Sequence, residues 1–444
     1  LDVCGYQQFC PYWYNGFVAF RFTPPGWYFF AYPLYLLFTD VKVATSVAII
    51  LSFLLGFFIT WYGGKKLGLN SLQRLFFFLF FAANANAIRG FLRTGRPHEL
   101  LAWVIFFGLF FTLLWYKDKK ITLRFYLLSF LYAACIITYV AVGVFASLLL
   151  AGLFLIKSGK ERWHIVLTTA LGVVLTFFWT IPYLLHLKES SLLATQQATW
   201  LLHFTPDLLL KQSASFVFPL FFLFLFYLSW KRMPDRRHLL FFLPTLLLAV
   251  FYIFRLNIFL PVFRDIFPSP YFNFFLLLSG YLYLQLSDNT FLERITHGLV
   301  LFGIIISCVI SLFFTPYFAQ PTSAAEDLLT LIPQVQDTYF ILDLPPDVYD
   351  KAIVAYASIY HNKTTSAGYY QHLAPSSYLE SLSQLGHAMD TSDCSTFTTS
   401  LTLLNTTQFI SYTHCDFLAS CNLALTTHYK GYCIYTSEQH KQAF

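Results

Sequence analysis

Ten apolar stretches, each near the roughly 20 residues that a helix needs to cross a bilayer, constrain this chain more than any other feature. Of its 444 residues, 57% are hydrophobic and only 11% are charged, and its mean hydropathy is +0.60. Such a composition excludes an ordinary soluble protein. We therefore predict a polytopic α-helical membrane protein with about ten spans, at residues 41–62, 72–92, 98–116, 121–138, 139–156, 164–185, 216–230, 239–254, 271–286 and 297–314.

The second stretch, residues 72–92, is the weakest of the ten, because Asn84 and Asn86 shorten its apolar part. The alternative is a segment that lies in the membrane interface without crossing. In that case Lys65, Lys66 and Arg74 would move to the other side of the membrane and the alternation of basic loops would break. We therefore predict a crossing here.

Basic residues gather in alternate loops between the predicted spans and so indicate an orientation. The positive-inside rule places such loops in the cytoplasm, so we expect a plasma-membrane protein with both ends of this chain extracytoplasmic. The net charge of +6 is spread over these loops, and we expect no nucleic acid partner. The loop residues are Lys65, Lys66, Arg74, Lys117, Lys119, Lys120, Arg124, Lys157, Lys160, Arg162, Lys231, Arg232, Arg236 and Arg237.

The same pattern predicts three parts: a first extracytoplasmic loop at residues 1–40, a transmembrane domain at 41–314 and a small extracytoplasmic α+β domain at 315–444. The sequence lacks an initiator Met, so we expect it to begin mid-protein, after one further span that would bring the total to eleven. In the last part, β-formers predict strands at 339–342, 408–412 and 432–435, and helices are expected at 378–387 and 396–404. Residues 390–393 read as a capped turn before the second of these helices.

Six of the eight cysteines lie in the polar ends of the chain, whereas Cys135 and Cys308 lie within apolar stretches. An even set outside the bilayer suits disulfides in an oxidising compartment, although their pairing cannot be read from sequence. Free buried thiols are the alternative. The six are Cys4, Cys10, Cys394, Cys415, Cys421 and Cys433.

Three arginines, Arg89, Arg93 and Arg96, lie in a loop on the predicted outer side, where arginine is scarce. Pro97 is suited to begin the next helix, because its fixed φ and missing N–H fit a first helical position. Guanidinium groups bind phosphate oxygens bidentately, and a helix start adds backbone donors. We therefore predict a phosphate site at this loop. The alternative is that the arginines anchor to lipid headgroups by snorkelling.

The sequence contains no self-sufficient catalytic signature. It has no Asp-x-Asp, Glu-x-Asp or Asp-x-Glu triplet, no His or Cys pair with metal-ligand spacing, and no nucleophile elbow or phosphate-loop pattern. A metal requirement is therefore left open. Among the predicted outer loops, Glu99 and Asp265 are the carboxylates worth testing.

Several short motifs resemble the GT-C superfamily of polyprenyl-phosphate-sugar glycosyltransferases. They are most similar to prokaryotic membrane proteins labelled 6-pyruvoyl-tetrahydropterin-synthase-related or YfhO-like. The resemblance implies no pterin chemistry. The motifs are Trp13 with Tyr32-Pro33-Leu34, Gly95-Arg96-Pro97-His98-Glu99-Leu100-Leu101-Ala102, Trp179-Thr180-Ile181-Pro182 and Gly368-Tyr369-Tyr370.

The resemblance implies transfer of a sugar from a polyprenyl-phosphate carrier, the donor substrate, to an extracytoplasmic glycan, protein or lipid acceptor, with membrane lipid as a partner. Arg89, Arg93 and Arg96 would neutralise the leaving phosphate, with Arg264 as a further candidate. The base that activates the acceptor hydroxyl would be Glu99, Asp265 or, as the main expectation, a carboxylate upstream of Leu1. A divalent metal is an open cofactor.

Two departures from the family pattern keep other functions open. The early catalytic Asp of the family is missing, and Asp2 is a poor substitute. Where Phe-Pro-x-Arg is expected, the chain has Phe267-Pro268-Ser269-Pro270-Tyr271, without the arginine. The alternatives are a transporter or lipid-handling protein for glycoconjugates, against which the lack of an internal repeat counts, and a catalytically inactive GT-C relative.

Overall fold

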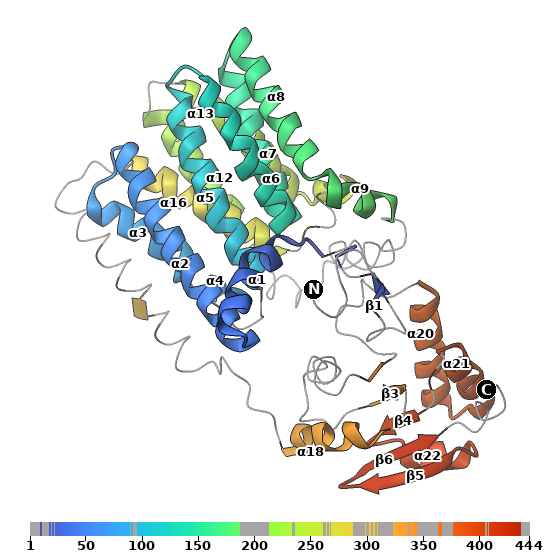
Figure 1. Ribbon diagram of the computed structural model, residues 1–444. Coiled ribbons are helices and arrows are strands. Elements are labelled where there is room, and N and C mark those ends of the chain that lie inside the picture. The colour runs from blue at the N-terminus through green and yellow to red at the C-terminus, as the bar shows by residue number, and fades with distance from the viewer. Residues whose placement is uncertain are drawn as a thin grey trace. The chain divides into compact units, whose positions relative to one another are not determined.

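The chain forms two compact units (Figure 1). The helical unit comprises Pro24–Pro182 and Ala194–Phe318, and the mixed unit comprises Leu1–Thr23, Tyr183–Leu193 and Ala319–Phe444. The computed structural model describes residues 9–10, 17–18, 20–21, 23–88, 90–91, 96–186, 213–232, 236–260, 263, 266, 268–286, 298, 302, 305–306, 309, 323–335, 338–343, 363–365, 376–404, 406 and 408–436.

Helices make up the described part of the helical unit. Each apolar stretch predicted between residues 41 and 286 coincides with one or two of them, whereas α1 lies in the part predicted as the first loop. The helices that begin in this unit are α1 (Gly26–Phe38), α2 (Val41–Lys66), α3 (Ser71–Ala82), α4 (Ala85–Ile88), α5 (Pro97–Lys117), η2 (Leu123–Leu127), α6 (Leu128–Thr138), α7 (Val140–Ile156), α8 (Lys160–Leu175), α9 (Phe177–Leu185), α12 (Ser213–Arg232), α13 (Arg236–Phe241), α14 (Leu243–Ile253), η4 (Leu256–Phe259) and α16 (Pro268–Leu286).

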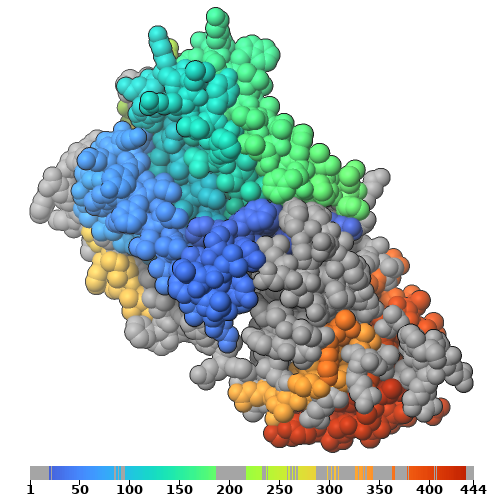
Figure 2. All heavy atoms as spheres, viewed as in Figure 1, coloured from blue at the N-terminus to red at the C-terminus, as the bar shows by residue number. Residues whose placement is uncertain are grey.

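Helix α5 lies at the centre of this unit and packs against α2, α6 and α7. In its most apolar window 78% of the residues are buried, compared with 28% for α2. By contrast, α1 lies on the surface, where Leu36 and Leu37 are exposed (Figure 2). The centre of the unit is therefore built around one helix that is apolar on nearly all sides.

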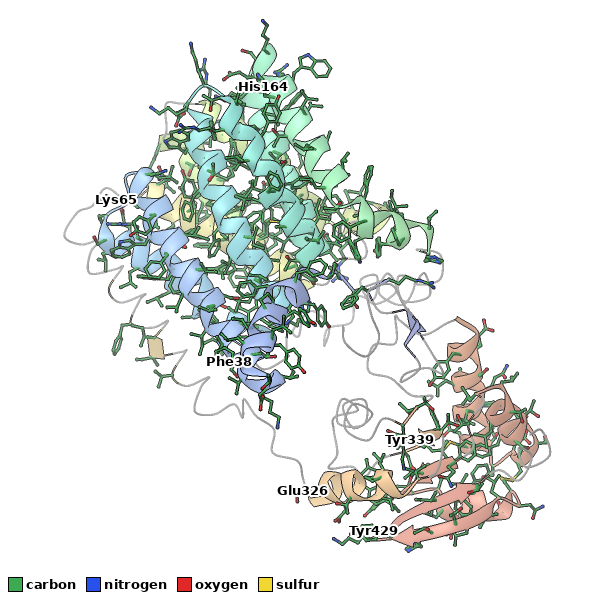
Figure 3. All side chains as sticks on the ribbon, in the orientation of Figure 1. Phe38, Lys65, His164, Glu326, Tyr339 and Tyr429 are labelled. Atoms are coloured by element: carbon green, nitrogen blue, oxygen red, sulfur yellow. A yellow bond between two sulfur atoms is a disulfide. The ribbon has the colours of Figure 1, made fainter. Side chains whose placement is uncertain are left out.

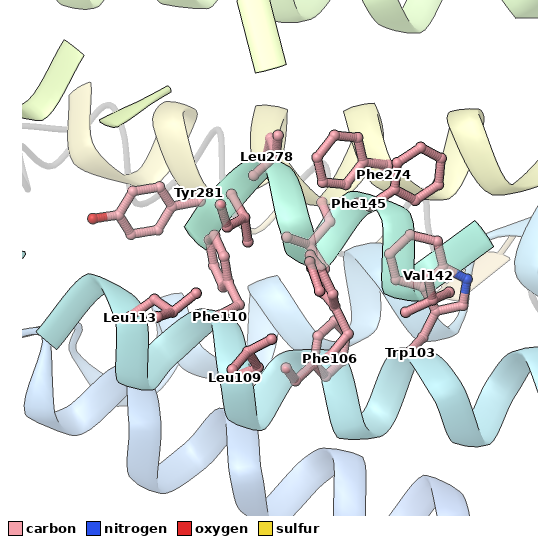
Figure 4. Packing of buried hydrophobic residues seen from close by; sticks show 14 of the residues in the cluster. Trp103, Phe106, Leu109, Phe110, Leu113, Val142, Phe145, Phe274, Leu278 and Tyr281 are labelled. Atoms are coloured by element: carbon pink, nitrogen blue, oxygen red, sulfur yellow. The ribbon is translucent and has the colours of Figure 1, made fainter. Parts of the chain in front are cut away.

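Aromatic rings fill the space between α5, α7 and α16 (Figures 3 and 4). Phe145 of α7 stacks on Phe274 of α16 with ring centroids 4.4 Å apart. Phe110 of α5 meets the ring of Tyr281 edge to face at 5.5 Å. Such offset and edge contacts satisfy the ring quadrupoles and add to the stabilisation from burial.

The described helices do not support the predicted number of ten spans. Two of them, α2 and α5, are long and apolar enough to cross a membrane, and the pair α8 and α9, bent by 71°, could be a third. The other described apolar helices include several shorter ones, such as α3, α7 and α14. The stretch 297–314 lies outside the described residues except at isolated positions.

Asn84 explains why the stretch at 72–92 does not form one long helix. Its Nδ2 donates to the carbonyls of Phe80 and Phe81 at 3.0 and 2.6 Å, and its Oδ1 accepts from the amide of Ala87 at 2.9 Å. The side chain thus ends α3 and begins α4. Helix α3 has 12 residues, about 18 Å, which falls short of the roughly 30 Å of hydrocarbon that a span must cross.

The mixed unit contains a four-stranded sheet with the strand order β3-β4-β6-β5. Strand β3 (Tyr339–Ile341) is parallel to β4 (Gln408–Ser411), whereas β6 (Tyr432–Thr436) is antiparallel to both β4 and β5 (Ala424–Tyr429). The predicted strands at 339–342, 408–412 and 432–435 are confirmed, and β5 was not predicted. The remaining elements are the short strands β1 (Phe9–Cys10) and β2 (Phe17–Val18) and the helices α18 (Ser323–Leu331), η5 (Ile332–Gln334), α20 (Ser376–Thr391), α21 (Cys394–Leu403) and α22 (Cys415–Ser420).

Two disulfides hold the helices of the mixed unit to its sheet and to each other. Cys394 at the start of α21 pairs with Cys421, and Cys415 of α22 pairs with Cys433 of β6. Disulfides in the C-terminal part are therefore confirmed. The capped turn is confirmed as well, because Asp393 accepts hydrogen bonds from the amides of Ser395 and Thr396 at the start of α21.

Asp343, at the end of β3, fastens β3 to the turn after β4. Its carboxylate accepts hydrogen bonds from the hydroxyl of Ser411 at 2.6 Å, the amides of Tyr412 and Thr413 at 2.9 and 2.8 Å, and the hydroxyl of Thr413. Nδ1 of His414 lies 3.0 Å from Oδ2. Burial acts to raise the pKa of Asp343, but the hydrogen bonds from Ser411, Thr413 and Tyr412 outweigh it and lower the pKa.

Gly152 of α7 allows close packing against α13, because a Cβ there would overlap the carbonyl oxygen of Phe241. We predict that Gly152→Ala lowers the free energy of unfolding by about 1–3 kcal/mol, measured as a lower thermal midpoint in detergent. The control is Gly108→Ala on α5, whose Cβ would lie 3.8 Å from Leu131, an ordinary contact. Equal midpoints for the two variants would contradict this packing.

Asp343→Asn should destabilise the mixed unit by about 1–3 kcal/mol at neutral pH, since the donors around it lose a charged acceptor. Because the pKa of Asp343 is lowered in the folded state, the ionised carboxylate adds to the free energy of unfolding. This contribution is fully present above the unfolded-state pKa of about 3.9 and is lost as the pH falls through the folded-state pKa. Thermal unfolding of the full chain between pH 7 and pH 2 should therefore show wild type and variant converging in acid. A constant difference at all pH values would refute this, and Glu380→Gln on α20 is the control at neutral pH.

Candidate functional site

Two of the predicted site residues, Arg96 and Glu99, lie in the described part of the chain, and they lie together. The others, Arg89, Arg93, Arg264 and Asp265, lie outside the described residues. The candidate site therefore consists of Arg96, Glu99 and the residues that contact them.

Pro97 is the first residue of α5, as predicted, and Arg96 is the N-cap. The carbonyl of Arg96 accepts hydrogen bonds from the amides of Glu99 and Leu100 at 3.1 and 3.4 Å. Glu99 is the acidic residue of the first turn, where a negative charge interacts favourably with the helix dipole. The local sequence thus fixes Arg96 at the positive end of a 21-residue helix.

The guanidinium of Arg96 contacts two other helical positions. Its Nη1 donates to the hydroxyl of Ser269 at 3.1 Å and lies 3.9 Å from Oε2 of Glu99. About 35% of the Arg96 side chain is exposed, compared with 1% for Glu99. Ser269 and Glu99 therefore hold the guanidinium of Arg96 in place, and part of its side chain remains accessible to a ligand.

Glu99 is buried between α5 and α16. Its Oε1 accepts hydrogen bonds from Nδ2 of Asn273 at 3.0 Å and from the indole N–H of Trp103 at 3.4 Å. Its Oε2 accepts no hydrogen bond from the described residues and has Arg96 as its neighbouring cation. A buried carboxylate requires such partners, because an unpaired one is costly.

Sequence reasoning missed Ser269, Asn273 and Trp103. Ser269 lies within the segment that departs from the Phe-Pro-x-Arg pattern, and it contacts Arg96 from 173 positions away along the chain. Two signals could have drawn attention to the others: Asn273 is a polar residue near the start of an otherwise apolar stretch, and Trp103 follows Glu99 by one helical turn. Neither signal identifies the partner.

A second buried polar segment follows α14. Arg255 is only 7% exposed and adopts a left-handed backbone with φ of 57°, and Asn257 is 1% exposed. Nδ2 of Asn257 has no hydrogen-bond partner among the described residues. The segment is linked to α16 through Tyr252, whose ring lies 4.4 Å from that of Tyr271.

The opposite face of α5 from Glu99 borders an open apolar groove of about 300 Å³. It is lined by α1, α2, α5 and α6, with Leu101, Val104 and Gly108 contributed by α5. Within the described ranges no group of three or more His, Cys, Asp or Glu residues could hold a metal ion.

No known protein-family model matches the sequence, and no curated protein matches it either. The likeness to GT-C glycosyltransferases therefore stays a prediction from short motifs.

The contact between Glu99 and Asn273 should appear as an energetic coupling. We predict that Glu99→Gln and Asn273→Leu each destabilise the protein and that the double variant loses less than the sum, with a coupling of about 1–3 kcal/mol. Unfolding in detergent of the wild type, both single variants and the double variant measures it. For comparison, Ser279→Ala on the same helix should combine additively with Glu99→Gln, and additivity in both cycles would contradict the contact.

Proposed function

We propose that the chain is an integral membrane glycosyltransferase of GT-C type. It would take a sugar from a polyprenyl-phosphate carrier and transfer it to an acceptor on the extracytoplasmic side. The bond between the sugar's anomeric carbon and the phosphate oxygen breaks, and its electron pair stays on the phosphate. The acceptor oxygen bonds to the anomeric carbon, and the acceptor's proton passes to a base.

The placement of Arg96 carries this proposal. An accessible guanidinium, oriented by Ser269 and Glu99 and located at the start of α5, meets the needs of a leaving phosphate. Preorganised donors stabilise charge as it develops without having to reorganise during the reaction. The helix start contributes its positive dipole end to the same place.

Glu99 is better suited to positioning than to proton transfer. Its Oε1 is already engaged by Asn273 and Trp103, and its side chain is 1% exposed, whereas a general base must reach the proton that it accepts. We therefore assign Glu99 the role of holding Arg96. Asp265 remains a candidate base.

The apolar groove beside α5 favours a second candidate, a lipid-handling protein for glycoconjugates. An open groove with an apolar lining suits a hydrocarbon chain. The two candidates differ in chemistry, because a lipid-handling protein would bind the carrier without releasing the sugar from it.

We predict that Arg96→Gln lowers sugar transfer by about 10²–10³-fold, the usual effect of removing one preorganised donor. Changing Arg89, Arg93 and Arg96 together to Gln should abolish transfer and leave membrane insertion intact. The assay follows a radiolabelled sugar from a synthetic polyprenyl-phosphate donor in proteoliposomes. Lys42→Gln, an exposed residue in the first turn of α2, is the charge-matched control. Unchanged transfer in the triple variant would rule out this role.

A further inference from the structure

The end of the helical unit where α2 and α5 finish is rich in both basic and aromatic side chains. Nζ of Lys66, at the end of α2, lies 5.9 Å from the ring centroid of Trp115, near the end of α5. Nζ of Lys157, just after α7, donates to the carbonyl of Lys119, just after α5, at 2.5 Å. These contacts bring the ends of three helices to one surface, called here the basic end.

Charge at the basic end is strongly unbalanced. Its described acidic residues are Asp118 and Glu161. A carboxylate oxygen of Asp118 lies 3.5 Å from Nζ of Lys117. Glu161 accepts a hydrogen bond from the amide of Ile121 at 2.8 Å and lies 3.9 Å from Nζ of Lys157. Burial lowers the pKa of Lys157, and the charge of Arg237 lowers it further, whereas Glu161 and Asp118 act to raise it. Both acids are thus engaged locally. The exposed basic residues that belong to the same helix ends and loops are Lys65, Lys66, Lys119, Lys120, Arg124, Lys160, Arg162, Lys231, Arg232 and Arg237.

Exposed tryptophans accompany these cations. Trp115, Trp163 and Trp230 are 38%, 68% and 55% exposed. Cations also lie over aromatic rings: Arg74 is 4.2 Å from the ring of Trp61, and Lys231 is 4.8 Å from that of Tyr227. Tryptophan and tyrosine beside lysine and arginine are typical of the headgroup layer of a membrane. In that layer the apolar part of each aromatic side chain faces the hydrocarbon and its polar group faces water.

Other parts of the helical unit differ from this. In Figure 3, Lys65 and His164 lie toward the upper side of the helical unit and Phe38 toward the lower side. After Phe38 the chain continues to Asp40, the N-cap of α2. The carboxylate of Asp40 accepts hydrogen bonds from the amides of Lys42 and Val43. Among the residues that the structure describes, exposed cations and exposed tryptophans thus occur together at the basic end.

We propose that the basic end binds the headgroups of anionic phospholipids, with Lys65, Lys66 and Trp115 at the edge between α2 and α5 as the main contact. The ammonium groups would attract the anionic headgroup, and the indole would lie at the level of the glycerol backbone. Each basic residue near an anionic membrane surface strengthens binding, and salt weakens it. This binding requires no glycosyl transfer, so it stands or falls separately from the proposed enzymatic activity.

The test measures binding of phosphatidylglycerol and phosphatidylcholine to the full chain in neutral detergent by native mass spectrometry. Wild type should prefer phosphatidylglycerol, and Lys65→Gln and Lys66→Gln should each weaken its binding about fivefold. Trp115→Leu should weaken binding of both lipids. Raising the salt concentration to about 0.5 M should remove most of the preference, because screening shortens the reach of exposed charges.

Lys42→Gln, a lysine of the first turn of α2, is the matched control and should bind both lipids as wild type does. The three lysine variants should keep the wild-type thermal midpoint without added lipid, since the changed lysines are exposed. Equal binding of the two lipids by wild type would overturn the proposal. So would unchanged preference in Lys65→Gln and Lys66→Gln, or tighter binding of a soluble polyglutamate peptide than of phosphatidylglycerol, which would indicate an acidic protein partner.

Discussion

The buried carboxylate of Glu99 links α5 to α16 through a hydrogen bond from Asn273. Around it the helices meet through aromatic rings, which attract one another with little preference for one register over another. The hydrogen bond from Asn273 is directional, and the neighbouring charge of Arg96 leaves few positions in which the carboxylate is satisfied. The contact between Glu99 and Asn273, within an apolar core, therefore fixes the position of α5 relative to α16 and the orientation of Arg96.

In the mixed unit a carboxylate also joins two elements, but its partners are neutral hydroxyl and amide donors. Asp343 is satisfied by hydroxyl and amide donors of the turn after β4, and it joins two parallel strands at their ends. Disulfides add covalent links where the sheet and its helices are small. Among the described residues, Glu99 has one neighbouring cation, Arg96, and fewer hydrogen-bond donors, so Glu99 and Arg96 support each other's position.

Apolar periodicity and turn residues predicted where helices and strands lie, because those signals are local. The boundary expected after residue 138 is confirmed: α6 ends at Thr138, and α7 begins after the extended backbone of Tyr139. The number of spans was less predictable. Asn84 marked the stretch at 72–92 as the weakest, but hydropathy did not show that its side-chain hydrogen bonds end α3 after 12 residues. At the candidate site, residue type and loop position singled out Arg96 and Glu99 as candidates, and their roles stay a prediction. Ser269 and Asn273 reach them only through tertiary packing across more than 170 positions.

Arg96 is proposed to bind the phosphate of a lipid carrier. The most direct test is a solid-state NMR distance between ³¹P of a bound polyprenyl phosphate and ¹⁵N-labelled arginine side chains in proteoliposomes. A charge-assisted hydrogen bond predicts a phosphorus–nitrogen distance of about 4 Å, with a dipolar signal in wild type that is lost in Arg96→Gln. A signal that is absent at saturating lipid, or unchanged in Arg96→Gln, would contradict the claim.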